Sequence, residues 1–469
     1  MSSFKIAIIG SGISGLAAAF RLQEMAVEKK IPLTIRLFEK KARAGGVIQS
    51  FFSNGFLLEA GPDSFIIDKP SGLQLCQKLN LDSQLIPTNP NLKHSFILKR
   101  NQLIPVPEGF FLLAPSKILP FMFSPLLPLS GKLRAGMEWM IPKRISDSDE
   151  SIGSFVERRF GKDILENIAQ PLISGIYNIS PHELSLQACF PRFREMETHH
   201  GSILRSFLKS SYLPPKRVSG ARYSLFLSFK QGMETLVTAL VSKLSPSCFS
   251  WNTPIESIQR NSDRQWILKG PQKSITFDQL IIALPPVHAA PLFHSLHPDL
   301  SHLLQSMPSQ EAATLNLAYP RASIHHPLDG FGFVVPEKEN KHFSGCTFAS
   351  RKFDFRSPES FELIRLFLSP RGIQYFHEHG ETETINLLIN EISQILHISG
   401  TPMLSQFHYH AQAMSPFRVG HLEKVKKIQS MLKKLPGIEI CGNGFVGSGI
   451  PDCIHSGTQS AEKIIQSYG

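Results

Sequence analysis

The sequence predicts an α/β protein in which a domain with a parallel sheet is assembled from separate pieces of the chain. IAIIG at 6–10 is a short apolar run typical of a buried parallel strand, and a glycine-rich turn and an apolar-faced helix follow it. LIIALPP at 280–286 is a second buried run, which prolines end. The segment Ile438–Cys441 is a third, followed by another glycine-rich loop and a helix of small residues. Because these runs are far apart in the sequence, the domain must be discontinuous.

The turn after the first strand, GSGISG, has the features of a dinucleotide-binding loop. Gly10 allows the tight turn, Gly12 lets the backbone approach a pyrophosphate, and Gly15 lets helix and strand pack closely. Free N–H groups and the positive end of the helix dipole then face the phosphate. TIRLFEK at 34–40 is the next strand and ends in Glu39, where a carboxylate can accept hydrogen bonds from an adenosine ribose. The alternative is a glycine-rich turn that holds no ligand.

Further glycine-rich segments favour FAD over NAD as the cofactor. Just after Glu39, the segment KKARAGG supplies Arg43, Gly45 and Gly46 as another contact for a pyrophosphate. Near the other end, the loop 442–449 leads into a helix whose positive end can face the pyrimidine side of a reduced flavin. Two phosphate-type loops at opposite ends of the chain must meet around one long cofactor, and FAD fits that requirement.

Composition indicates a globular protein that favours anionic partners. The 469 residues are 42% hydrophobic and 19% charged, which excludes an intrinsically disordered chain. Lys and Arg outnumber Asp and Glu by 49 to 38, and a net charge of +11 favours nucleic acid, acidic lipid or an acidic small molecule. The basic residues are scattered, without the aromatic interleaving of a nucleic-acid groove, so we expect no nucleic acid partner.

The cysteines and histidines predict no metal site. The six cysteines have neither CxxC nor zinc spacing, and we interpret them as buried thiols in a reducing cytoplasm. The pairs His199–His200, His325–His326 and His408/His410 lack partner ligands at metal spacing, which favours ordinary surface or core histidines. We therefore expect a cytoplasmic protein without a metal ion.

One apolar stretch, 109–129, predicts either membrane contact or an internal wall. It has transmembrane length, but it contains four prolines and Lys117, which do not suit a lipid-exposed spanning helix. Short apolar helices on the surface fit better, and the basic residues that flank them (Lys132, Arg134, Lys143 and Arg144) could meet anionic headgroups in a peripheral contact. The alternative is the wall of a substrate channel. The first apolar run of the chain is the nucleotide strand, so we expect no signal peptide.

We expect three domains. The cofactor domain takes 1–90, 213–290 and 411–469, a helical apolar domain takes 91–212, and a mixed-sheet α+β substrate domain takes 291–410 with contributions from 91–212. The helical domain includes 145–177, where Asp147, Asp149 and Ser151 are possible caps. A proline-rich bend at 213–216 precedes a helix within 229–244 that is entered through Gly232.

Beyond the nucleotide loops, the stretch PLISGIYNISPHELSLQACFPRFREMETHHGSILR at 171–205 contains an SGVY-like turn, LS, a Phe, an acidic residue and GS. In this stretch the chain resembles a helical segment of the oxygen-dependent porphyrinogen oxidases among the amine oxidase-type flavoproteins. GKLRAGMEWM, FKQGMETL, GFGFVVP at 330–336 and SGIPDCIHSG at 448–457 match that family as well. The resemblance covers essentially the whole chain.

This resemblance implies a Rossmann-like FAD domain and the six-electron oxidation of a porphyrinogen in haem biosynthesis. Protoporphyrinogen IX or coproporphyrinogen III would lose hydride from a meso carbon to the flavin in three two-electron steps, and O2 would be reduced to H2O2. No triad, metal or strong general base is then required, because positioning and a dry pocket supply most of the catalysis.

The resemblance also implies site residues. Cofactor contacts are expected at Gly10, Gly12, Ile13, Ser14, Gly15, Glu39, Lys40, Arg43, Gly45, Gly46, Gly61, Pro62, Ile255, Gly442, Gly449, Ile450 and Pro451. For the substrate, the backbone carbonyl of Gly175 would lie near the reacting ring, and Val334 and Phe367 would clamp and stack on the macrocycle. The alternatives are a helix-ending glycine at 175 and core packing for the other two.

Two positions depart from the family pattern. Thr347 stands where an aliphatic residue is usual, and Ser95, in KHSFILKR at 93–100, stands where many relatives carry an Arg that holds a propionate. Lys93, His94 or Lys99 could substitute for that Arg. Two other functions stay open, namely another flavin enzyme of the amine oxidase or carotenoid desaturase type, and a non-catalytic lipid-binding protein on the same fold. The second of these predicts damage to the pyrophosphate glycines or Arg43, and none is seen.

Overall fold

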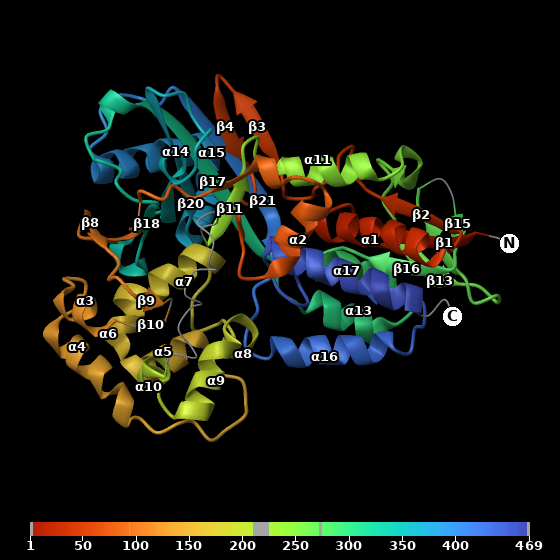
Figure 1. The fold of residues 1–469 in the computed structure, drawn as a ribbon, viewed down its shortest axis with the longest axis horizontal. Coiled ribbons are helices and arrows are strands. Elements are labelled where there is room, and N and C mark those ends of the chain that lie inside the picture. Colours follow the sequence, from red (N-terminus) through yellow and green to blue (C-terminus); the bar gives the residue numbers. More distant parts are fainter. Residues whose placement is uncertain are drawn as a thin grey trace.

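A computed structural model describes residues 3–92, 94–111, 113–115, 117–209, 225–271 and 274–466. A five-stranded parallel sheet in the order β12-β2-β1-β16-β22 forms the centre of one half of the molecule (Figure 1). Its strands are β1 (Phe4–Ile9), β2 (Leu33–Phe38), β12 (Phe249–Ser250), β16 (Gln279–Ile282) and β22 (Ile438–Ile440). Strands from three distant parts of the chain therefore share one sheet, which confirms the predicted discontinuous assembly.

Both faces of this sheet are covered, as its continuous apolar strands require. Along β1, Ile6 and Ile8 belong to one core, and Ala7 and Ile9 belong to another. The first core contains four helices: α1 (Ile13–Lys29), α2 (Pro70–Lys78), α11 (Glu234–Lys243) and α17 (Ile450–Gln466). The second contains the antiparallel sheet of β13 (Ser257–Arg260), β14 (Trp266–Lys269) and β15 (Ser274–Phe277), with α12 (Pro286–Ala289), α13 (Pro298–Gln305) and α16 (His421–Leu432). Helices from the two ends of the chain, α1 and α17, lie side by side.

A second, seven-stranded sheet has the order β21-β17-β20-β19-β18-β7-β8. Its strands are β7 (Phe96–Lys99), β8 (Gln102–Pro105), β17 (Gln310–Pro320), β18 (Gly332–Val334), β19 (Phe343–Phe348), β20 (Phe361–Leu368) and β21 (Leu404–Met414). The long helix α15 (Pro370–Leu396) packs on one face of this sheet. That face carries the sheet residues Leu315, Leu366, Phe407 and their neighbours. Because side chains alternate along a strand, the residues between these point to the opposite face, which faces the parallel-sheet half of the molecule.

Short strands connect the two sheets. β3 (Ser50–Ser53) and β4 (Phe56–Glu59) form a hairpin. A three-stranded sheet combines β5 (Phe65–Ile66), β6 (Leu85–Pro87) and β11 (Phe226–Phe229). β9 (Phe110–Phe111) and β10 (Ala114–Pro115) pair near the helical region. The predicted helix within 229–244 begins at Glu234, two residues after Gly232, whereas the proline-rich bend at 213–216 lies outside the described residues.

The helical region around residues 118–208 has its own apolar core. Its helices are α3 (Ile118–Phe123), α4 (Leu129–Gly136), η2 (Met137–Met140), α5 (Ile152–Phe160), α6 (Lys162–Ile164), a π-helical turn η3 (Leu165–Ala169), α7 (Gln170–Tyr177), α8 (Leu186–Cys189), α9 (Pro191–His200) and α10 (Ile203–Leu208). Ser151 caps α5 by accepting a hydrogen bond from the Ser154 N–H at 3.0 Å. Asp149 is not a cap, since its carboxylate binds the Ser185 hydroxyl and the Gly420 N–H.

A buried ion pair holds η2 against this core. The side chains of Glu138 and Arg159 are both fully buried and bonded to each other, and the Glu138 carboxylate also accepts from Ser202 Oγ at 2.6 Å and the Ile203 N–H at 2.9 Å. Glu197 is a second buried partner of Arg159, at 3.5 Å. Removing Glu138 therefore leaves the Arg159 charge poorly compensated.

We predict that Glu138→Ala lowers the free energy of unfolding by about 3 kcal/mol, because Arg159 then keeps only its longer ion pair with Glu197 (3.5 Å) and the buried donors of Ser202 and Ile203 lose their acceptor. Guanidinium titration followed by circular dichroism measures the change. Glu166→Ala is the control, since the exposed pair of Glu166 with Lys162 contributes at most about 1 kcal/mol. Equal destabilisation by the two variants would contradict this account.

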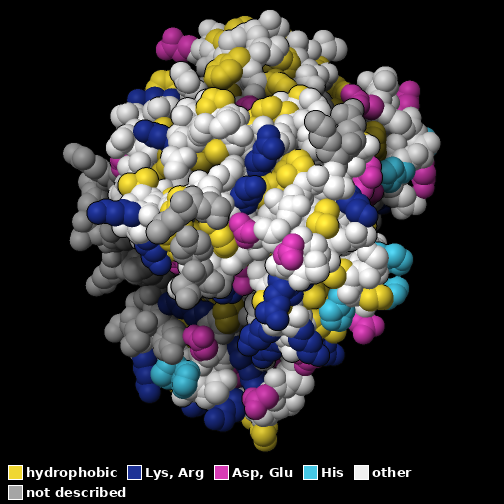
Figure 2. Space-filling model, turned by 90° about the vertical axis from the view of Figure 1, so that its right-hand side faces the viewer, with side chains coloured by type: hydrophobic (Ala, Val, Ile, Leu, Met, Phe, Trp, Pro, Cys, Tyr) yellow, Lys and Arg dark blue, Asp and Glu magenta, His cyan; other side chains and the backbone are white. Residues whose placement is uncertain are grey.

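The surface reflects the excess of basic residues. Figure 2 shows Lys and Arg side chains gathered in the lower half of the face that lies at the right of Figure 1. Helix α16 lies at the bottom of the parallel-sheet half in Figure 1, and its Lys426 and Lys427 are exposed. Within the described parts of the chain, no helix combines the length and the apolar character needed to cross a membrane.

Candidate functional site

The predicted phosphate loop lies at the carboxyl end of β1, where open parallel sheets bind ligands. A Cβ on Gly10 (φ +99°) would lie 2.6 Å from the Ala283 carbonyl oxygen, and one on Gly15 would lie 2.0 Å from the Gly10 carbonyl oxygen. Packing alone therefore requires these two glycines. A Cβ on Gly12 would meet nothing within 4 Å, so Gly12 leaves space above the turn. Helix α1 begins there with no side-chain cap and no acidic residue in its first turn, which suits an anionic pyrophosphate.

The second glycine-rich segment lies beside the first. The Gly45 N–H donates to the Ser11 carbonyl at 2.9 Å, and a Cβ on Gly46 would lie 3.5 Å from Gly12 Cα. The Arg43 guanidinium donates to the carbonyls of Ala44, Gly46 and Ile48. Arg43 thus orders this loop around the space above Gly12, and its direct contact with a pyrophosphate stays a prediction.

Glu39 stands at the end of β2, as its predicted role requires. Its carboxylate accepts the N–H and the hydroxyl of Ser11 at 3.0 and 2.8 Å, and its other oxygen accepts the Lys41 N–H at 3.0 Å. The Thr253 N–H donates to the Glu39 carbonyl at 2.8 Å, which brings the segment that carries Ile255 alongside. Lys40 is exposed at the same edge.

The C-terminal loop meets the N-terminal one. A Cβ on Gly457 would lie 2.1 Å from the Ser14 carbonyl oxygen, so α17 approaches α1 this closely only with glycine there. The Gly442 N–H donates to Ser456 Oγ at 3.2 Å, and α17 begins at Ile450–Pro451, directly after Gly449. The structure therefore brings the glycine-lined ends of the chain together and fits one extended dinucleotide cofactor such as FAD.

A cluster of buried charges anchors the turn that contains Gly61 and Pro62. A Cβ on Gly61 would lie 1.9 Å from the Val47 carbonyl oxygen. Burial alone would raise the pKa of Asp63, but Lys352 and Arg365 lower it below its usual range. Burial raises the pKa of Glu59 to about 7, although Ser50 and the Met233 N–H donate to its carboxylate.

Two of the three predicted substrate residues lie on the seven-stranded sheet, and the third lies in a helix that packs on it. Val334 pairs with Gly345, Gly345 pairs with Phe367, and that row continues through Thr314 to His408. These side chains share the face opposite α15. A Cβ on Gly175 would lie 2.8 Å from Val334 Cγ1, so α7 packs on the same row.

Gly175 does not end its helix, because α7 continues to Tyr177 and Asn178 takes the left-handed capping conformation (φ 51°). The helix-ending interpretation is therefore wrong. Phe367 and Val334 are partly exposed rather than fully buried, which also weighs against core packing as their whole role.

Three hydrogen bonds place this face against the turn 59–61. Arg365 Nη2 donates to the Gly61 carbonyl at 2.6 Å, His410 Nε2 binds the Ala60 carbonyl at 3.0 Å, and Asn316 Nδ2 donates to the Glu59 carbonyl at 3.4 Å. Motif reasoning missed Arg365, Asn316 and His410 as site residues. The signal was available in FELIRLFL, where the alternation puts Arg365 on the same face as Phe367.

The departures from the family pattern lie at this sheet as well. Thr347 pairs with Gly332 and Arg365 in the row next to Phe367. Ser95 is exposed, and Lys93 lies outside the described residues. Lys99 Nζ donates to the carbonyls of Pro125 and Leu126, and its pKa is lowered by burial and by the nearby charges of Lys338, Arg100 and Lys132.

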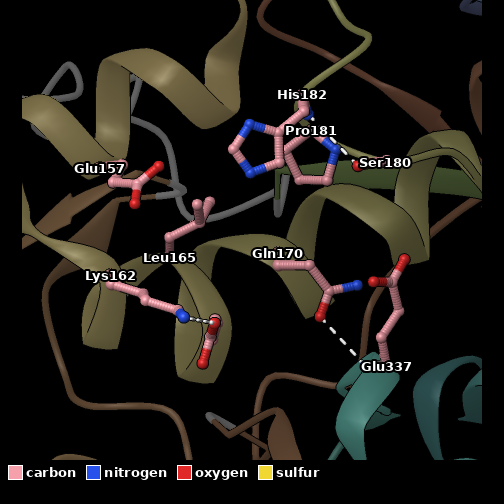
Figure 3. A pocket seen from close by; sticks show the side chains of 9 residues that line it. Glu157, Lys162, Leu165, Gln170, Ser180, Pro181, His182 and Glu337 are labelled. Carbon is pink, nitrogen blue, oxygen red and sulfur yellow. Dashed lines mark hydrogen bonds and ion pairs between the residues drawn. The ribbon is translucent and has the colours of Figure 1, made fainter.

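A separate pocket lies beside α7 and the π-helical turn (Figure 3). Its volume is about 160 Å³, and it is lined by Glu157, Lys162, Leu165, Glu166, Gln170, Ser180, Pro181, His182 and Glu337. The Gln170 side chain accepts the Glu337 N–H at 3.2 Å and donates to Ser174 at 3.0 Å, which ties α7 to the segment after β18. This pocket is too small and too polar for an apolar macrocycle.

The discontinuous parallel-sheet domain, its glycine-lined loops and the adjoining sheet face define a flavin-dependent oxidoreductase. The chain belongs to the flavin containing amine oxidoreductase family, whose model matches residues 13–465. FAD is therefore its cofactor, and the predicted relationship to the porphyrinogen oxidases is confirmed by the relatives below.

Two curated relatives cover nearly the whole chain. The coproporphyrinogen III oxidase of Bacillus subtilis is 31% identical over 98% of this chain and 97% of its own length. The mitochondrial protoporphyrinogen oxidase of Nicotiana tabacum is 25% identical over 99% of this chain and 95% of its own length. A crystal structure from Exiguobacterium, provisionally named a protoporphyrinogen oxidase, covers both chains completely with a TM-score of 0.86 and 25% identity.

Proposed function

We propose that this protein oxidises a porphyrinogen to the porphyrin in haem biosynthesis, with coproporphyrinogen III as the favoured substrate and O2 as the acceptor. The observation that carries the proposal is the meeting of Gly175, Val334 and Phe367 on one sheet face next to the turn that holds Gly61. The relative named coproporphyrinogen III oxidase is also more similar to this chain than the one named protoporphyrinogen oxidase. When bound, FAD supplies the two-electron chemistry, taking hydride from the substrate and passing electrons to O2 with formation of H2O2.

The shape of the sheet face suits a large flat apolar substrate. Gly345 lies between Val334 and Phe367, so no side chain projects between these two residues, and Thr347 and Arg365 border the gap in the next row. Val334 and Phe367 then flank a floor of backbone on which a macrocycle can lie. Helix α7 closes one side of this floor, where Gly175 packs against Val334.

A side-by-side assay tests this function. Purified protein is mixed with coproporphyrinogen III or protoporphyrinogen IX in air, and porphyrin fluorescence and peroxide are followed together. We expect coproporphyrinogen III to react faster, with about three peroxide molecules for each porphyrin. Rates no higher than autoxidation with both substrates would refute the proposal and favour another flavin oxidoreductase or a lipid-binding protein.

We also propose that this protein works in the cytoplasm and touches membranes peripherally through α3, α4 and η2. Leu119, Phe123, Leu129 and Met140 there are 71%, 83%, 67% and 74% exposed. Lys132 and Lys143 are close in sequence to these apolar residues, and basic residues beside an apolar surface favour anionic headgroups.

The cysteines support the cytoplasmic location. All six are unpaired, which suits a reducing compartment.

The combined change of Leu119, Phe123 and Leu129 to Ser is expected to weaken sedimentation with anionic vesicles by about tenfold, because it removes apolar area that would enter the bilayer surface. Val27→Ser, at a 77% exposed position on α1, is the matched control and should change nothing. Unaltered partitioning of the triple variant would rule out this contact.

A further inference from the structure

We propose that Arg365 is a positioning residue that couples the flavin-binding turn to the substrate face. Arg365 lies on β20 two residues before Phe367, on the face opposite α15, and is only 3% exposed. Its neighbours on the other face, Ile364 and Leu366, are ordinary core residues. A buried cation is costly unless its hydrogen bonds and countercharges compensate, so its contacts indicate what it does.

Arg365 touches both halves of the proposed site. Nη2 donates to the Gly61 carbonyl at 2.6 Å and lies 3.4 Å from Thr314 Oγ1, and the guanidinium carbon is 5.0 Å from the centre of the Phe367 ring. One planar group therefore holds the main chain of the turn next to Pro62 and, by a cation–π contact, the predicted stacking residue. A shift of either element would move the other.

The charge of Arg365 is balanced from the cofactor side. Burial lowers the pKa of Arg365, while Asp63 and Glu59 raise it. These two carboxyls flank Gly61 in the chain, so the countercharges belong to the turn that the guanidinium holds. The ion cluster thereby fixes the turn relative to β20.

Two buried nitrogens on this face are still available for hydrogen bonds. Within the described structure, Arg365 Nε and His408 Nε2 have no hydrogen-bond partner. Burial and the neighbouring Arg365 lower the pKa of His408 to about 4, so its imidazole is neutral at pH 7. Arg159 Nε, in the helical core, lacks a partner as well, so the orphan donor alone does not distinguish Arg365. What distinguishes Arg365 Nε and His408 Nε2 is that both lie on the proposed substrate face, where a bound molecule can hydrogen-bond to them.

Arg356 provides a matched control. It is 2% exposed, and its guanidinium donates to Ser228 and to the Phe229 carbonyl. It therefore reaches the turn only indirectly, through the Ser228 hydroxyl that donates to the Asp63 carbonyl at 2.6 Å. Loss of a buried guanidinium can therefore be compared with and without the coupling contacts.

The test compares Arg365→Met, Arg365→Lys and Arg356→Met in flavin-loaded protein. For Arg365→Met we expect an altered visible circular dichroism of bound FAD, about tenfold weaker FAD binding and a KM for coproporphyrinogen III raised about tenfold. Arg365→Lys keeps the charge without the planar fork and should fall between the wild type and Arg365→Met. Arg356→Met should lower the melting temperature, and it should change the FAD spectrum and KM clearly less than Arg365→Met does.

Three outcomes would overturn the inference. In the first, Arg365→Met folds and keeps the wild-type FAD spectrum and KM. In the second, Arg356→Met changes the FAD spectrum and KM as much as Arg365→Met does. In the third, Arg365→Met does not fold and Arg365→Lys has the wild-type FAD spectrum and KM. The substrate half of this inference rests on the proposed function. Because the FAD readouts use no porphyrinogen, failure of that function would remove the KM prediction alone.

Discussion

Replacement of Gly12 by aspartate is expected to give a folded protein that retains no FAD. A side chain at this position meets nothing within 4 Å and the backbone is not in a left-handed conformation (φ −65°), so the protein itself tolerates the change. The new carboxylate would occupy the space into which the uncapped start of α1 directs its N–H groups, and it would repel a pyrophosphate. Like charges brought together cost several kcal/mol, which corresponds to a loss of FAD affinity of about 100-fold or more.

The ratio of flavin to protein absorbance in the purified variant measures this effect, and far-ultraviolet circular dichroism checks the fold. Gly15→Ala separates folding from binding, because its Cβ would lie 2.0 Å from the Gly10 carbonyl oxygen and should destabilise the protein itself. Gly12→Asp that purifies with a full complement of flavin would show that this turn does not hold the cofactor.

Gly175→Leu is expected to lower kcat/KM for a porphyrinogen by about 100-fold without loss of FAD. Even a Cβ at this position would lie 2.8 Å from Val334 Cγ1, so a leucine must push α7 away from β18 or enter the space above Gly345. Overpacking of this kind costs about 1–3 kcal/mol, and here it falls on the element that closes the substrate face. Initial rates at varied porphyrinogen concentration measure the loss.

Gly136→Leu is the control for this variant, because it makes the same change in helix α4, where a Cβ would meet nothing within 4 Å. It should keep the wild-type kcat/KM. If Gly175→Leu stayed within twofold of the wild type, Gly175 and Val334 could not border the substrate.

The cofactor half of the site could be predicted from the sequence because its chemistry is local. Gly10, Gly12 and Gly15 follow one strand directly and Glu39 ends the next, so the position of each follows from secondary structure alone. The meeting of α1 with α17 is a long-range contact, but the glycine-rich loops at both ends of the chain already indicated it. The predicted contact of Arg43 with the pyrophosphate stays a prediction, since the Arg43 guanidinium donates to carbonyls of its own loop.

The substrate half depends on strand register, which no local pattern specifies. Phe367, Thr314 and His408 share a row because β20, β17 and β21 pair with one particular offset, and a shift by one residue would turn each side chain to the other face. Gly175, Val334 and Phe367 were reached by resemblance to a family, whereas Arg365 and His408 carried no motif. Of the possible caps, Ser151 and not Asp149 caps the helix, and the sequence could not show this because the partners of Asp149, Ser185 and Gly420, lie far along the chain.

Anaerobic mixing of the FAD-loaded protein with coproporphyrinogen III tests the central claim most directly, since it joins the cofactor site to the substrate face without O2. The account predicts that the visible flavin absorbance bleaches when the porphyrinogen is added and returns when air is admitted, with porphyrin fluorescence rising in step. Flavin absorbance that stays unchanged with both coproporphyrinogen III and protoporphyrinogen IX would contradict it.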